Sequence, residues 1–204
     1  GNDSTLSNGT IANRTRTINH AETSEVIKAI LMAGAARETS FGDPLSREVT
    51  NYTPNTSRNN LDDRFGAGSV NIFNSHNILA AGEQDSAQDG NSNDIAHQGF
   101  DYDPSFGGAN GSNDTASYFF TAASGDPFIT ASLVWNIDVE QDQLSLEDYD
   151  KTLYNLDLEL WNLTTNTLEG VSDSLNEVTE NLWQSLTPNH QYEIRVVSSE
   201  LSDF

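Results

Sequence analysis

The 204-residue sequence contains no cysteine, which excludes disulfide scaffolds, thiolate zinc sites and cysteine nucleophiles. Basic residues are also scarce: 9 Lys and Arg stand against 31 Asp and Glu, so the formal net charge is -22. A surface of this sign repels nucleic-acid phosphates and anionic lipid headgroups. No hydrophobic run approaches the roughly 18 residues that a membrane-spanning helix requires. These absences argue against nucleic-acid binding and against membrane insertion.

The first residues also lack the cationic segment and apolar stretch of a secretory signal peptide. Many secreted bacterial proteins manage without disulfides, so the lack of cysteine is compatible with export. Hydrophobic residues make up 35% of the chain and aromatic residues 9%, which is sufficient for a folded core. We therefore expect a secreted, extracellular bacterial protein whose signal peptide is absent or already removed.

The N-terminal part combines two helices with polar loops. Residues 24–36 predict a helix because apolar side chains recur at helical spacing, and Thr23 or Ser24 is expected to accept a hydrogen bond from the first-turn amides. Four of its apolar side chains are expected to be buried: Val26, Ile27, Ile30 and Leu31. A glycine-containing segment, residues 65–71, precedes a second short helix that is predicted over residues 72–81.

Polar composition separates these elements from their surroundings. Residues 1–20 are rich in Asn, Ser, Thr and Gly, which predicts a loop or disordered terminus. Residues 86–97 are again polar and predict a linker. The chain is thus expected to divide into a helical and irregular segment over residues 21–85 and a separate domain over residues 98–204.

Beyond residue 98 the hydrophobic pattern changes to a period of two. In Leu156–Trp161, leucines alternate with Asp157, Glu159 and Trp161, as in a half-buried strand. The same kind of pattern predicts further strands over residues 118–122, 129–135, 168–171, 178–183 and 192–197. Several short alternating strands that are separated by turn signals indicate an antiparallel β-sandwich.

Four pieces of this C-terminal part occur in a particular order: residues 131–136 (ASLVWN), 155–161 (NLDLELW), 172–174 (SDS) with Glu180, and 186–196 (LTPNHQYEIRV). In order and spacing they resemble the pre-peptidase C-terminal type of jelly-roll domain that follows many secreted proteases. The resemblance implies the fold class that we expect for the chain. It is mainly β: an antiparallel jelly-roll β-sandwich preceded by a small, mostly helical and irregular N-terminal segment.

Two pieces of the N-terminal part, residues 24–32 (SEVIKAILM) and 65–71 (FGAGSVN), are similar to the tail of a subtilisin-like catalytic domain. That family carries such a helix after its catalytic-serine helix, and such a glycine segment just before its closing helix. Residues 22–82 match in order and spacing. The two resemblances support one another, because a jelly roll directly behind a subtilisin-like domain is a common arrangement.

The catalytic residues of that family are not in this sequence. A subtilisin-like site needs an Asp, a His as general base and a nucleophilic Ser. The Gly-Thr-Ser nucleophile motif is missing, since Gly9-Thr10 is followed by Ile11, and the His-Gly-Thr segment is missing too. Four histidines match no family context and are expected to be surface or structural residues: His20, His76, His97 and His190. We therefore expect no peptidase activity and no catalytic or cofactor-binding residue in this chain.

Acidic clusters raise the question of calcium. Asp89, Asn91 and Asn93 resemble the first ligands of a calcium loop, but position six is Asp94 rather than Gly and position twelve is Phe100 rather than Glu. Two more pairs of carboxylates are close in sequence: Asp101 with Asp103, and Asp157 with Glu159. Calcium binds many proteins of the family resembled, so an ordered ion stays open as the alternative. We expect solvated acidic surface and no metal ligands.

Three tryptophans invite a carbohydrate-stacking platform: Trp135, Trp161 and Trp183. Packing is the expectation for aromatic residues on strands, with Trp135 in the core and Trp161 on the exposed Asp157 face.

The sequence supports two hypotheses about function. The first is a non-catalytic C-terminal region of a secreted subtilisin-like serine protease, whose jelly-roll accessory domain stabilises, positions or regulates the parent. Its partners are the parent catalytic domain or a second copy of the chain. The alternative is a free-standing secreted binding module for carbohydrate or a cell-surface partner.

Overall fold

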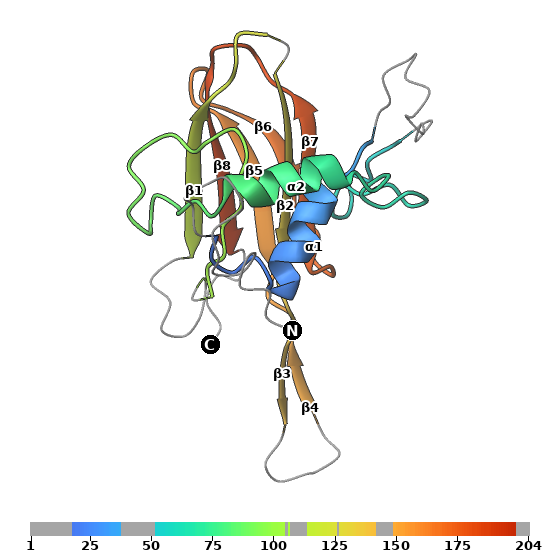
Figure 1. The fold of residues 1–204 in the computed structure, drawn as a ribbon. Helices are drawn as coiled ribbons and strands as arrows, with labels where there is room; N and C mark the ends of the chain where they lie inside the picture. The colour runs from blue at the N-terminus through green and yellow to red at the C-terminus, as the bar shows by residue number, and fades with distance from the viewer. Residues whose placement is uncertain are drawn as a thin grey trace.

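The computed structural model describes residues 18–37, 52–104, 106, 114–125, 127–141 and 149–198. Two helices come first, α1 (Ser24–Ala33) and α2 (Ile72–Ala81), and the strands follow (Figure 1). The strands are β1 (Thr115–Thr121), β2 (Phe128–Val134), β3 (Asp138–Gln141), β4 (Tyr149–Thr152), β5 (Leu156–Asn162), β6 (Thr167–Ser172), β7 (Thr179–Ser185) and β8 (Gln191–Ser198). The prediction of a mainly β fold with a small helical N-terminal segment is confirmed.

All strand pairs are antiparallel, as predicted. One sheet has four strands in the order β1-β8-β5-β6, a second contains β2 and β7, and a third is the β3–β4 hairpin. The hairpin extends away from the other strands (Figure 1). The three sheets are separate and do not close on one another. We call residues 115–198 the β region, and residues 18–100 the N-terminal segment.

The alternating leucines of β5 explain how the β region folds. Leu158 and Leu160 are buried and pair with Val196 and Ile194 of β8, whereas the residues between them face outward. The core combines residues of the four-stranded sheet and of the β2–β7 sheet: Ala116, Ala122, Ile129, Leu158, Leu160, Leu182, Tyr192 and Val196. The sheets approach closely at Gly170 of β6, where a Cβ would lie 2.7 Å from Oε1 of Gln184 in β7. Period-two burial therefore brings two sheets onto one apolar core.

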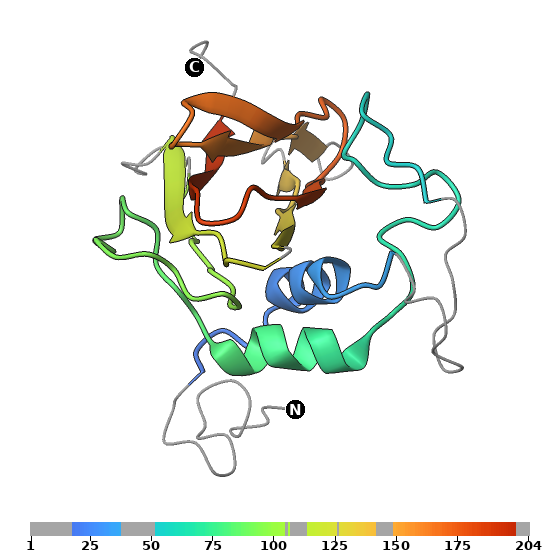
Figure 2. The same cartoon turned by 90° about the horizontal axis from the view of Figure 1, so that it is seen from above.

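Helix α1 packs on β2 and on α2 and lies between α2 and the strands (Figure 2). It ends at Ala33, three residues before the predicted end, because Gly34 follows where the two helices nearly touch. A Cβ on Gly34 would lie 2.6 Å from Oγ of Ser75 in α2. The burial prediction was right for Val26 and Ile30 and wrong for two others: Ile27 is 42% exposed and Leu31 is only half-buried.

The two helix starts differ from one another. The predicted side-chain cap of α1 is absent: Thr23 occupies the N-cap, but its hydroxyl donates to the carbonyl of His20 (2.5 Å). Helix α2 has the predicted bounds, and Oδ1 of Asn71 accepts a hydrogen bond from the amide of Asn74 (3.1 Å). Gly82 ends α2 with φ of 92°, in the region that favours glycine.

The segment predicted as a linker, residues 86–97, lies against β1. The amides of Ala87 and Ile95 donate to the carbonyls of Ser117 and Phe119 in β1 (2.9 and 2.7 Å). Ser86 is fully buried. The segment thus covers the outer edge of β1, where free strand groups would otherwise be open to pairing with another chain. Of the predicted terminal loop, residues 1–17 lie outside the described residues and Ile18 is fully buried.

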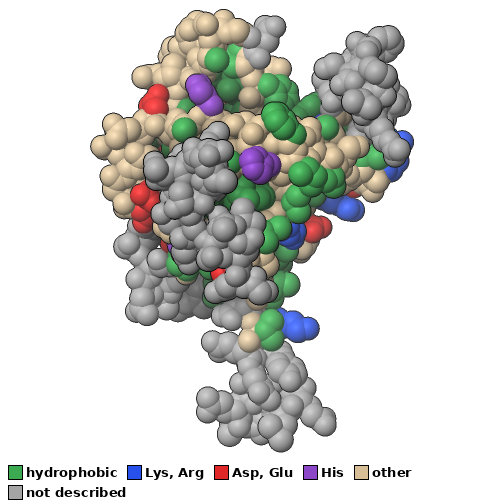
Figure 3. Space-filling view, viewed as in Figure 1, with side chains coloured by type: hydrophobic (Ala, Val, Ile, Leu, Met, Phe, Trp, Pro, Cys, Tyr) green, Lys and Arg blue, Asp and Glu red, His purple; other side chains and the backbone are tan. Residues whose placement is uncertain are grey.

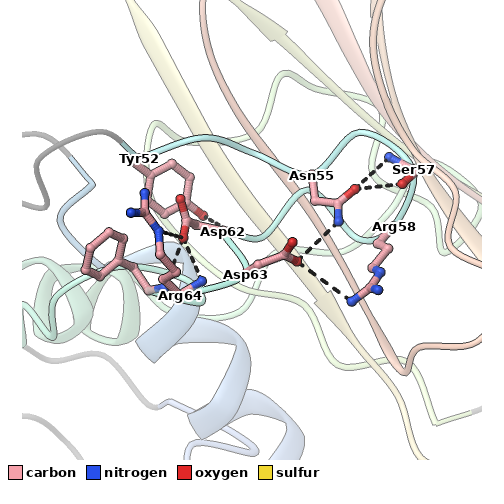
Figure 4. A network of polar contacts seen from close by, with 8 residues as sticks. Tyr52, Asn55, Ser57, Arg58, Asp62, Asp63 and Arg64 are labelled. Carbon is pink, nitrogen blue, oxygen red and sulfur yellow. Dashed lines mark hydrogen bonds and ion pairs between the residues drawn. The ribbon is translucent and has the colours of Figure 1, made fainter.

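The loop of residues 52–66 is organised around the buried carboxylate of Asp62 (Figure 4). Its Oδ1 accepts the amides of Arg64 and Phe65 (2.7 and 3.1 Å), and its Oδ2 accepts the amide of Thr53 (2.8 Å). These amide donors hold the pKa of Asp62 below its usual range. Oδ1 of Asp63 accepts a hydrogen bond from Nδ2 of Asn55 (3.2 Å) and forms an ion pair with the guanidinium of Arg58 (3.7 Å). The loop contains no helix or strand over these residues, and the hydrogen bonds to Asp62 fix its shape instead.

Candidate functional site

Three of the candidate calcium residues, Asp89, Asn91 and Asp101, accept hydrogen bonds within the protein. Oδ2 of Asp89 accepts from Ser86 (2.7 Å), and Oδ1 of Asn91 accepts the amide of Asn93 (3.0 Å), as in a turn. Oδ2 of Asp101 accepts from the hydroxyl of Tyr118 (2.7 Å). In the part of the chain that the structure describes, no three His, Asp or Glu residues are arranged to hold a metal ion.

The four histidines lie in four different places. Nδ1 of His20 is 2.7 Å from Oε1 of Glu83, and Nδ1 of His190 is 2.9 Å from Nδ2 of Asn162. His76 and His97 are exposed. Among the described residues no histidine is hydrogen-bonded to a serine, the contact that an acyl-transfer site requires. The expectation that the chain has no peptidase activity stays a prediction.

Each tryptophan has its own surroundings rather than a common platform. Nε1 of Trp135 donates to the carbonyl of Tyr154 (2.9 Å). Trp161 is half-buried on the outer face of β5, where it donates to Oε2 of Glu159 (2.6 Å) and lies beneath the guanidinium of Arg195 (5.2 Å to the ring centroid). Trp183 packs in an aromatic group at the other sheet, with Tyr52 and Phe128.

That aromatic group encloses a buried arginine. The guanidinium of Arg37 lies 5.0 Å from the ring centroid of Tyr52 and 5.6 Å from that of Trp183. Its Nε donates to the carbonyl of Ala67 (3.1 Å). Burial lowers the pKa of Arg37 from its ordinary value. The arrangement attaches the chain that follows α1 to the outer face of β7.

Three asparagines form a second attachment, which we call the asparagine clasp: Asn59 and Asn60 of the 52–66 loop, and Asn181 of β7. Nδ2 of Asn59 donates to Thr179 (2.9 Å), and Nδ2 of Asn181 donates to the carbonyl of Asn59 (3.0 Å). Nδ2 of Asn60 donates to the carbonyls of Val171 and Asn181 (2.7 and 3.0 Å). Buried polar groups that satisfy one another in this way hold two segments in one fixed relation.

Glu180, next to the clasp, is a fully buried carboxyl group near the start of β7. Oε2 accepts from the hydroxyl of Ser172, and Oε1 accepts from the amide of Ser174 (2.9 Å). Burial raises the pKa of Glu180 to about 7, and the nearby charges of Asp157 and Asp173 add to this effect. Glu180 thus holds the β6–β7 turn and is sensitive to pH.

Helix α2 is packed near its end and exposed at its start: Ile78 and Leu79 pack on the cluster around Ile30 of α1, whereas the large apolar side chains of its first turn are exposed. Ser75 and Ala80 are its buried residues. Ile72 and Phe73 are 66% and 74% exposed, and Val70 just before the helix is 71% exposed. Hydrophobic side chains gather over α2 on this face of the molecule (Figure 3). We call Val70, Ile72 and Phe73 the α2 apolar surface.

No protein-family model matches this sequence, and a search of curated proteins found no match. The two helices have 10 residues each, and no helix in the described ranges is long and apolar enough to cross a membrane. Sequence reasoning missed the enclosed Arg37 and the α2 apolar surface, and it named Glu180 with residues 172–174 only as part of a family resemblance, not as a buried group. Val70, Ile72 and Phe73 were a signal for the surface, whereas the enclosure of Arg37 depends on tertiary contacts.

Proposed function

We propose that this chain is the non-catalytic C-terminal region of a secreted subtilisin-like serine protease. In this proposal the β region is a jelly-roll sandwich, and the N-terminal segment is the tail of the catalytic domain. The parent's catalytic domain packs on the α2 apolar surface. The β region then stabilises and positions the parent enzyme without taking part in the chemistry.

The exposure of large apolar side chains at the start of α2 is the observation that carries this proposal. Burying a large apolar side chain is worth about 1.5–3 kcal/mol, and contiguous exposed apolar groups mark contact sites. Ile72 and Phe73 are mostly exposed, in a chain with a net charge of -22. In the family resembled, the segment similar to residues 65–71 leads into the closing helix of the catalytic domain. A catalytic domain that covers Phe73 would complete the core that α2 leaves open.

The contacts of the N-terminal segment agree with a connecting role. One side is fastened to the β region, by the packing of α1 on β2, by Arg37 in its aromatic group and by the asparagine clasp. The opposite side carries the α2 apolar surface. A segment fixed to the β region on one side and apolar on the other transmits the position of the β region to whatever covers α2.

The reading frame upstream of residue 1 gives the first test. Segments with the Asp, the His and a Gly-Thr-Ser nucleophile upstream would support the proposal. A signal peptide directly upstream, with no such segments, would contradict it and favour a free-standing module that binds carbohydrate or a cell-surface partner.

A matched pair of variants in the full-length protein gives the second test. Phe73→Asp places a charge in the proposed contact and should shorten the half-life of peptidase activity at elevated temperature several-fold. Leu175→Asp, at a site in the β6–β7 turn that is 71% exposed against 74% for Phe73, is the control and should leave the half-life unchanged. Equal half-lives for the two variants would contradict a contact at α2.

A further inference from the structure

A hollow lies between the N-terminal segment and the β region. Its largest part has a volume of about 520 Å³ and is bounded by α1, by residues 95–101 and by β2. Two further parts, of about 170 and 330 Å³, share Phe100, Asp101 and Ser132 with the first. The size is within the range of small-molecule sites, about 300–1,000 Å³.

The hollow exists because α1 meets the strands with small residues. Ala29, Ala33 and Gly34 line it from the helix side, while Ile129 and Ala131 line it from β2. Because the residues of the helix side are so short, they do not reach the side chains of β2, and a space is left between them. The hollow is open to solvent, so its apolar lining is in contact with water. A bound apolar group would remove part of that lining from water.

The charges that line the hollow are of one sign. Three carboxylates take part, Glu25, Asp101 and Asp103, and among the described residues that line its three parts there is no Lys or Arg. Asp101 lines all three parts, and Tyr118 holds it in place through a hydrogen bond of 2.7 Å. The net charge of -22 further concentrates small cations around the protein. A partly apolar space with three carboxylates, of which Asp101 is held by Tyr118, favours a cation with an apolar body.

We propose that this hollow is a binding site for a small apolar amine, whose ammonium group pairs with the carboxylate of Asp101 while its hydrocarbon part fills the space beneath α1. The ion pair offsets the cost of removing both charges from water, and the hydrocarbon supplies the affinity. A neutral ligand of the same shape gains only the free energy of burying its hydrocarbon part. A carboxylic acid of the same shape is repelled. This site does not depend on a parent protease.

Titration calorimetry of the full chain with three probes of equal length tests this proposal: hexylamine, hexanol and hexanoate. Hexylamine should bind saturably at one site, hexanol at least tenfold more weakly, and hexanoate without detectable heat. Asp101→Asn keeps the shape of the side chain and should lower hexylamine affinity to that of hexanol while leaving hexanol unchanged. Asp63→Asn, which removes an exposed carboxylate (68% side-chain exposure), is the control for general charge attraction and should bind as the wild type does.

Ala131→Leu narrows the hollow without changing charge and should weaken hexylamine and hexanol by the same factor. Melting curves confirm that each variant is folded. The proposal is overturned if no probe binds saturably, if hexanol binds as tightly as hexylamine, or if Asp101→Asn and Asp63→Asn reduce hexylamine affinity equally.

Discussion

The β region and the N-terminal segment solve the problem of burial in different ways. In the β region large side chains are inside: Leu158, Leu160 and Leu182 are almost fully buried. In the N-terminal segment, α2 buries Ser75 and Ala80 and exposes Phe73. The segment is attached to the β region by the asparagine clasp and by Arg37, and a hollow lies between the two. The β region therefore buries its large side chains with its own strands, whereas the N-terminal segment leaves Ile72 and Phe73 exposed, and it is for these that we propose a partner.

Truncation of one core side chain in each region should show the largest difference. Leu160→Ala removes atoms from a fully buried position and should lower the free energy of unfolding by about 4 kcal/mol. Ile30→Ala should cost about 2 kcal/mol, because Ile30 already borders the hollow and has fewer contacts to lose. Urea denaturation of both variants measures the difference. A larger cost at Ile30 than at Leu160 would show that the interface is packed as tightly as the core.

The pH dependence of stability should differ between Glu180 in the β region and Asp101 near the N-terminal segment, with an effect smaller than that of the Leu160 truncation. Burial raises the pKa of Glu180 in the β region to about 7 and that of Asp101 near the interface to about 6. The folded state therefore keeps protons that the unfolded chain has released, so stability is greatest below the unfolded pKa and is lost as the pH rises through the folded pKa. For Glu180 the loss extends to about pH 7, and for Asp101 it ends near pH 6.

Melting temperatures from pH 4.5 to 8 check this prediction. Glu180→Gln should remove a change of roughly 3 kcal/mol that lies mainly between pH 5 and 7. Asp101→Asn should remove only the pH-dependent change in stability that lies below about pH 6. Each variant is compared with the wild type at the same pH, so the contributions of the other carboxylates cancel. Identical pH profiles for the wild type and Glu180→Gln would mean that Glu180 is not held as the buried hydrogen bonds indicate.

Added ions should have the smallest effect and should not distinguish the regions. Salt screens the repulsion within a chain of net charge -22, so the melting temperature should rise slightly with sodium chloride. Calcium chloride at matched ionic strength should do the same and no more. An additional rise with calcium alone would reveal an ordered ion, since a ligand that binds only the folded state stabilises it. Asp89→Asn and Asp157→Asn would then locate that ion in one region or the other.

Local patterns predicted the elements whose causes are local. Helix α2 has the predicted bounds because Asn71 caps it and Gly82 ends it within the same short segment. The β5 strand follows from its alternating leucines. The hairpin β3–β4 was missed, because its residues (DVEQ and YDKT) carry charges without a clear alternation. The early end of α1 was missed as well, since the closeness of Gly34 to Ser75 is a tertiary contact.

The sequence by itself determined the mainly β class, the antiparallel arrangement and the position of both helices, because spacing of two or 3.6 residues decides which face of an element is apolar. Only the tertiary structure decided which elements meet. It placed the presumed linker along β1, paired Asp101 with Tyr118 and enclosed Arg37 between Tyr52 and Trp183. Each of these contacts joins residues that are far apart in the chain. Periodicity carries no information about such contacts, because they depend on how packed elements fill space.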